Sequence, residues 1–78
     1  MNIQTLLVLD SQCENALIDK HFHDQNDTWI VEHQNLFNEI IVTMKDGESK
    51  MYIEQHKNEF SFIHLLLKYY LEDEKKFN

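Results

Sequence analysis

The chain has 78 residues and a formal net charge of −7, with fourteen acidic residues, seven lysines, no arginine and one cysteine. This length predicts a single domain, residues 1–78, near the lower size limit for a core that is stable without cross-links. The acidic balance argues against direct nucleic-acid binding, because phosphate backbones are normally contacted by a basic surface that carries arginine.

The number of cysteines and the hydropathy of the chain indicate the cellular compartment in which the protein is expected. The single cysteine, Cys13, has no partner for an internal disulfide, which indicates a reduced, intracellular setting. The N-terminus has no basic region ahead of its apolar run, and no apolar segment approaches the roughly 20 residues that span a bilayer. We therefore expect a cytoplasmic protein with neither a signal peptide nor a membrane helix.

The first apolar run, residues 3–9 (IQTLLVL), is compatible with a short buried strand or with the start of a helix. Ser11 and Glu14 have the spacing of a capping box, which favours a strand followed by a helix from Gln12 to Asp24. The alternative is a single helix from Ile3 to Lys20 whose apolar face carries Leu6, Leu9, Cys13, Ala16 and Leu17.

The centre of the chain reads as β-structure. Thr28 to His33 alternates and is rich in β-branched and aromatic residues, which predicts a strand. Leu36 to Gln55 predicts a β-hairpin closed on Asp46 and Gly47, because Asp-Gly suits a type I′ turn. In this register one face carries Ile40, Val42, Met44, Met51 and Ile53, and the other carries Thr43, Lys45, Glu48, Lys50 and Glu54.

The last element is predicted to be a helix from Glu59 to Lys75, with Asn58 as its N-cap. It is apolar on most of its circumference, and such a helix is normally buried. One face can pack on the sheet, and the remainder must meet the first helix, a partner or a second copy in a homodimer. The candidate self-association residues are Phe62, Leu66, Tyr69 and Tyr70.

These elements together predict an α+β fold. A three- or four-stranded antiparallel sheet would have an N-terminal and a C-terminal helix packed on one of its faces.

The histidines and the cysteine are the residues most suited to metal binding or nucleophilic chemistry. His21 and His23, with Asp24 and Asp19, have ligand-type side chains, but residues two apart on a helix point away from each other. We therefore expect a solvated cluster with no bound metal or cofactor. Cys13 is expected to be a small core residue, and no catalytic signature is present, so the chain is not predicted to be an enzyme.

The acidic residues gather at the ends of the predicted elements. A negative surface of this kind could be presented to a groove lined by arginine or lysine, with charge-assisted pairing and fast, salt-dependent association. The candidate partner-binding residues are Asp46 and Glu48 at the hairpin tip and Glu72, Asp73 and Glu74 at the end of the last helix.

The pattern resembles the small acidic phage-encoded anti-CRISPR proteins that inhibit type II-A Cas9, especially the short α/β kind. The likeness lies in Met1-Asn2-Ile3, in Ile40-Ile41-Val42 leading to Asp46-Gly47, and in the amphipathic helix after the return strand. The resemblance implies a three-stranded sheet and a DNA mimic whose hairpin-tip acids engage the arginines of Cas9 that read the PAM. Asp46 matches that position, whereas Glu48 lies one residue earlier than the second acid of the family.

The expected function is therefore non-enzymatic: an acidic inhibitor that blocks the nucleic-acid-binding site of a basic host defence protein such as Cas9. The alternative is a homo-oligomeric accessory protein that associates through the apolar C-terminal helix. A third class, a metal-dependent activity at His21 and His23, ranks behind both.

Overall fold

A computed structural model describes residues 2–23 and 26–71 of the chain, with side chains described at positions 2–20 and 28–69. The described residues form five α-helices and one turn of π-helix. Their bounds in chain order are α1 (Ile3–His23), α2 (Asn26–Glu32), α3 (Gln34–Lys45), α4 (Gly47–Gln55), α5 (Ser61–Leu66) and η1 (Leu67–Leu71).

The predicted α+β fold is wrong, because the part of the chain that the structure describes contains no strand. All three segments expected to be strands are helical: residues 3–9 belong to α1, residues 28–32 to α2, and residues 36–55 to α3 and α4. The three-stranded sheet implied by the resemblance is overturned by the same observation.

The N-terminal helix is continuous over 21 residues, so the single-helix alternative was correct and the strand at residues 3–9 was wrong. Leu6, Leu9, Cys13 and Ala16 are buried along one side of it. Ser11, predicted to take part in a capping box, lies exposed within the helix. The N-terminal cap is Asn2, whose side-chain oxygen accepts hydrogen bonds from the amides of Gln4 and Thr5 at 3.0 and 3.4 Å.

Helix α2 is fixed to α1 through the only tryptophan of the chain. Trp29 is 2% exposed, and its indole Nε1 donates a hydrogen bond to the carbonyl oxygen of Ala16 at 2.7 Å. Trp29, His33 and Phe37 follow at intervals of four residues, and the ring centroids of Trp29 and Phe37 lie 5.1 Å apart. Residues four apart share one helix face. The three rings therefore form one column that extends from α2 across the junction into α3.

The α3–α4 region shows why the hairpin prediction failed. In α3 the inward positions are Phe37 and Ile40, buried, with Ile41 and Met44 half-buried, which is the i, i+3, i+4, i+7 spacing of a helix. Ile40 and Met44 satisfy a period of two and a period of 3.6 equally well. Val42 is the residue that separates the two patterns, and it is 68% exposed.

Asp46 and Gly47 form a corner between two helices, not the turn of a hairpin. Asp46 ends α3, with its amide donating to the carbonyl of Thr43 at 3.1 Å, and its own carbonyl accepts the first helical bond of α4 from Lys50 at 2.9 Å. Gly47 is the first residue of α4. The two supposedly facing strands are therefore successive helices, and Met51, expected in the core, is 60% exposed.

The last described helix begins at Ser61, after Phe60 as N-cap, so the predicted start at Glu59 with Asn58 as the cap is wrong. Its N-terminus is instead capped from α1. Asp10 is 8% exposed, and its Oδ1 accepts a hydrogen bond from the amide of Ile63 at 3.0 Å. N-cap side chains usually bind this third amide of a helix from the adjoining residue, whereas here the carboxylate comes from 53 positions earlier.

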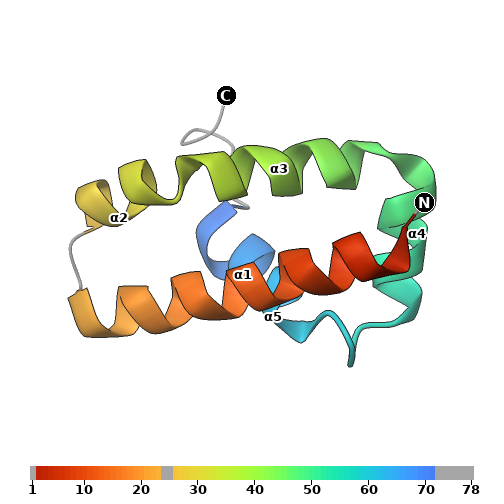
Figure 1. Cartoon of the computed structure of the whole chain (residues 1–78), viewed down its shortest axis with the longest axis horizontal. Coiled ribbons are helices and arrows are strands. Elements are labelled where there is room, and N and C mark those ends of the chain that lie inside the picture. The colour runs from red at the N-terminus through yellow and green to blue at the C-terminus, as the bar shows by residue number, and fades with distance from the viewer. Residues whose placement is uncertain (1, 24–25, 72–78) are drawn as a thin grey trace.

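The hydrophobic core lies where α1, α3 and α5 meet. In Figure 1, α1 and α3 run along the long axis of the molecule, α5 passes between them, and α4 lies at the end where α3 finishes. The core residues are Leu6, Leu9, Cys13, Ala16, Trp29, Phe37, Ile40, Ile53, Phe60, Ile63 and Leu66.

Among the described residues, no helix has both the length and the apolar character that crossing a bilayer requires.

Candidate functional site

The α3–α4 corner carries the two acidic residues predicted to bind a partner. Asp46 and Glu48 are both exposed. Asp46 Oδ2 accepts a hydrogen bond from the hydroxyl of Ser49 at 2.6 Å. This bond is the largest cause of a lowered pKa at Asp46, and the nearby amides of Glu48 and Ser49 lower it further. The corner therefore presents one carboxylate that is held in place and stays ionised well below neutral pH.

The same corner has a structural use for its acids. Asp46 is the residue that precedes α4, and Glu48 lies in the first turn of that helix. Negative charge at this position is stabilising, because the helix dipole places partial positive charge at the N-terminus. Lys45 and Lys50 are exposed on either side, so the excess negative charge of the chain is not concentrated at the corner.

The remaining predicted partner-binding residues, Glu72, Asp73 and Glu74, lie outside the described residues. Other exposed acids that the structure does describe are Glu32, Glu39, Glu54 and Glu59. They are distributed over α2, α3, α4 and the turn that follows α4. The negative surface is thus spread over several elements.

The residues predicted for self-association are only partly available. Leu66 is 0% exposed and belongs to the core, and Phe62 packs against that core. Tyr69 is 63% exposed, and the side chain of Tyr70 lies outside the described residues. Leu65, which was not among the predicted residues, is 40% exposed on α5, four residues before Tyr69 in η1. Among the side chains described at positions 61–69, the exposed large apolar ones are therefore Leu65 and Tyr69.

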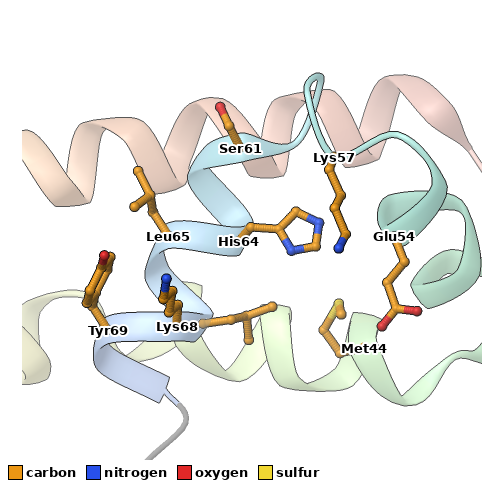
Figure 2. Close-up of a pocket in the computed structure, with 9 residues that line it drawn as sticks. Met44, Glu54, Lys57, Ser61, His64, Leu65, Lys68 and Tyr69 are labelled. Carbon is orange, nitrogen blue, oxygen red and sulfur yellow. The ribbon is translucent and has the colours of Figure 1, made fainter.

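These two side chains border an open pocket of about 550 Å³ between α3, α4 and the α5–η1 segment. Figure 2 shows Leu65, Lys68 and Tyr69 on one side of it, Glu54 on the other, and Lys57 and Met44 on opposite edges. The remaining lining residues are Ser61, His64 and Leu67. The pocket thus combines an apolar wall with charged groups of both signs, a surface suited to a partner side chain and without an evident reaction centre.

His64 lies at the centre of the pocket (Figure 2) and has a structural partner. Its Nε2 is 3.2 Å from the carbonyl oxygen of Ile53. Since a carbonyl only accepts, Nε2 carries the hydrogen. This bond joins α5 to α4 and fixes the ring between them.

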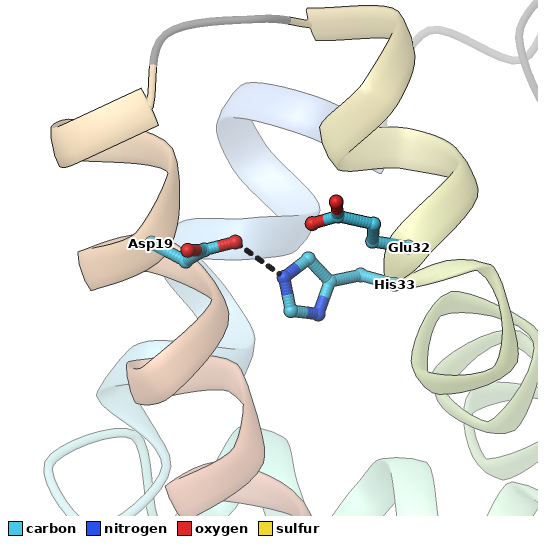
Figure 3. A group of neighbouring side chains, drawn as sticks. All are labelled: Asp19, Glu32 and His33. Carbon is cyan, nitrogen blue, oxygen red and sulfur yellow. Dashed lines mark hydrogen bonds and ion pairs between the residues drawn. The ribbon is translucent and has the colours of Figure 1, made fainter.

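The predicted histidine cluster takes a different form in the structure. The side chains of His21, His23 and Asp24 lie outside the described residues. Asp19 is instead brought to Glu32 and His33, and one ligand-type atom from each lies within 4.8 Å of the others. Figure 3 shows Asp19 on α1 facing Glu32 and His33 at the junction of α2 and α3. No sequence motif indicates this grouping, because Asp19 and His33 are 14 positions apart.

Cys13 is a core residue, as predicted. It is 0% exposed, and burial raises the pKa of its thiol to about 12, with further contributions from the charges of Asp10 and Glu39. A thiol with so high a pKa holds almost no thiolate at neutral pH, which makes it a poor nucleophile.

No protein-family model matches this chain, and no curated protein or solved structure is significantly similar to it. The functional argument therefore rests on the residues and their geometry.

Proposed function

We propose that this chain is a non-enzymatic, acidic binding protein of the cytoplasm that occupies the nucleic-acid-binding site of a basic partner. The observation that carries the proposal is the Asp46 carboxylate, which the Ser49 hydroxyl holds in place and which lies with Glu48 on an exposed corner between two helices. A carboxylate whose orientation is fixed before binding loses little conformational freedom when it pairs with arginine or lysine.

The whole-chain charge supports the same proposal. With a net charge of −7 and no arginine, the molecule attracts a basic groove over several ångströms and repels nucleic acid itself. Such attraction accelerates association and weakens as salt screens it. A Cas nuclease, which the sequence resemblance implies, is the first partner to test.

The test removes the corner charge and keeps the bond to Ser49. Asp46→Asn with Glu48→Gln retains an oxygen at residue 46 that can accept from the Ser49 hydroxyl, whereas lysine at that position has no acceptor. The matched control, Glu39→Gln with Glu59→Gln, removes the same charge from two other exposed positions.

Binding of each variant to Cas9 is measured by calorimetry at low and high salt, with and without competing duplex DNA. The proposal predicts that the corner variant loses at least about tenfold in affinity, a loss of the size expected for charge-assisted hydrogen bonds. The control should lose less, and DNA should compete with the wild type. Equal losses in the two variants, or binding that DNA leaves unchanged, would contradict the proposal.

A second candidate function is self-association through the face formed by Leu65 and Tyr69. The exposure of these two side chains beside an open pocket favours it, because exposed apolar groups that cluster often mark interaction sites. Tyr69→Asp should then yield monomers in sedimentation experiments. Val8→Asp, at an exposed apolar position of α1, is the control and should leave the association unchanged.

A further inference from the structure

We propose that Asp19, Glu32 and His33 form a binding site for a divalent transition-metal ion of the zinc class. The three side chains come from two separate stretches of the chain, α1 and the α2–α3 junction, and the fold brings their ligand-type atoms within 4.8 Å of one another (Figure 3). Two carboxylates and one imidazole are ligand types that zinc accepts.

One pair of ligand atoms already has a suitable separation. His33 Nε2 lies 3.0 Å from Asp19 Oδ2. Ligand atoms at zinc–ligand distances of about 2.0–2.2 Å in a tetrahedral site are roughly 3.3–3.6 Å apart, so these two atoms need to separate by only about half an ångström. A metal ion can therefore take the place of the hydrogen between these two atoms, with His33 binding through Nε2 as the neutral tautomer that carries its hydrogen on Nδ1.

The third ligand has the freedom to close the site. Glu32 is exposed at the end of α2. Its carboxylate can therefore move toward Asp19 and His33 by the distance of about 1–2 Å that a tetrahedral site requires. The carboxylates supply two negative charges to balance the ion. Three protein ligands leave one position for water, because the site opens to solvent, with Asp19 and His33 only partly covered.

The imidazole is held in place by packing. The His33 ring lies 5.6 Å from the Trp29 ring and 6.3 Å from the Phe37 ring, measured between centroids. Trp29 is in turn fixed by its hydrogen bond to Ala16. A ligand whose orientation is set in advance binds a metal with less loss of freedom, and a bound ion would tie α1 to the α2–α3 junction.

The single tryptophan provides the assay. Co²⁺ bound at His33 would lie close to Trp29 and quench its fluorescence, and Zn²⁺ would then compete with that quenching. The full chain without an affinity tag, treated with EDTA and dialysed, is titrated with CoCl₂ and then with ZnCl₂. We expect quenching that saturates at one Co²⁺ per chain and is reversed by Zn²⁺.

The variants are Glu32→Gln and His33→Gln, and the matched control is Glu39→Gln with His56→Gln, which removes the same group types elsewhere. Each ligand variant should raise the Co²⁺ concentration for half-saturation by more than about tenfold, since even outer-shell changes alter metal affinity 10–100-fold. The control should behave as wild type, and far-UV circular dichroism verifies the helix content of every variant.

A second readout is independent of fluorescence. Zn²⁺ should raise the melting temperature of the wild type and the control, because an ion that binds the folded state alone stabilises it. It should leave Glu32→Gln unchanged. Quenching that does not saturate, or that persists in Glu32→Gln and His33→Gln but is lost in His21→Gln with His23→Gln, would overturn the proposal.

Discussion

The buried carboxylate of Asp10 is disfavoured in its charged form, yet it accepts the hydrogen bond that caps α5. Burial is the largest cause of its raised pKa, and the amides of Ile63 and Phe62 oppose that increase. The carboxylate is nevertheless the cap of α5, whose adjoining residue, Phe60, supplies no side-chain hydrogen bond. The carboxylate therefore serves α5 as a hydrogen-bond acceptor, while burial disfavours its charged form.

This separation of geometry from charge predicts different effects for two substitutions at Asp10. Asp10→Ala leaves the amide of Ile63 without its partner and should lower the free energy of unfolding by about 1–2 kcal/mol. Asp10→Asn keeps an acceptor oxygen and should change it by less than about 0.5 kcal/mol at neutral pH. Urea denaturation of the three proteins measures both effects, and equal losses in the two variants would contradict the capping role.

The raised pKa also predicts the direction of a pH effect. The folded state holds the Asp10 proton more tightly than the unfolded state, where the ordinary value is 3.8. The stability that this contributes is fully present below 3.8 and is lost as pH rises through the folded-state value. Asp46, whose pKa is lowered, contributes in the opposite sense, with stability that is lost as pH falls.

Comparison of Asp10→Asn with the wild type isolates this effect, because the contribution of Asp46 is common to both proteins. The stability of the variant relative to wild type should increase between pH 3 and pH 7. The difference is obtained from urea midpoints at the two pH values, and a decrease over that range would show that burial does not dominate at Asp10.

At the scale of elements, Gly47 separates the helical corner from a hairpin. A Cβ added at this residue would meet no atom within 4 Å apart from its chain neighbours and the backbone of its own helix, and Gly47 begins α4. Gly47→Ala should therefore raise the free energy of unfolding by about 0.5–1 kcal/mol, since alanine favours the helix and restricts the unfolded chain. A type I′ turn would require positive φ at this residue, and alanine would then destabilise the protein. Whether Gly47→Ala stabilises or destabilises the protein, measured by thermal unfolding, distinguishes the helical corner from a hairpin turn.

Neighbouring residues of α3 provide a second distinction. Ile40 is 0% exposed and Val42 is 68% exposed, although both would face the core of the predicted hairpin. Ile40→Ala should cost about 2–4 kcal/mol of stability, and Val42→Lys should change it by less than about 0.5 kcal/mol. A large loss from Val42→Lys, measured by the same denaturation, would favour the strand.

Part of the fold could be predicted from the sequence. The apolar face of α1 follows a regular helical spacing over many residues, and the burial of Cys13 followed from its residue type. The short segments could not be predicted, because Ile40 and Met44 fit both helical and strand periods, and the Asp-Gly pair that favours a hairpin also suits the junction of two helices.

At the scale of the whole molecule, the contacts that build the α5 cap and the proposed metal site join residues far apart in the sequence, and no local sequence pattern predicts them. The bond from Asp10 to Ile63 and the grouping of Asp19 with Glu32 and His33 both join distant stretches. Local patterns report spacing along one element, and these contacts depend on how the elements pack. The exposure of Asp46 and Glu48 was predicted correctly, but their place at the tip of a hairpin was wrong, because the residues on both sides of them are helical.

The acidic residues proposed to bind a partner lie at the α3–α4 corner. The binding proposal requires Asp46 and Glu48 to lie at the junction of two helices, with Ser49 holding the Asp46 carboxylate. This arrangement exists only if residues 40–53 are helical on both sides of Asp46 and Gly47.

The most direct test is therefore the measurement of backbone Cα chemical shifts for residues 40–53 by NMR. Two helices predict shifts displaced downfield from random-coil values on both sides of the corner, with a break at Asp46. Upfield displacements on both sides, together with amide contacts between Val42 and Met51, would demonstrate a hairpin and contradict the account.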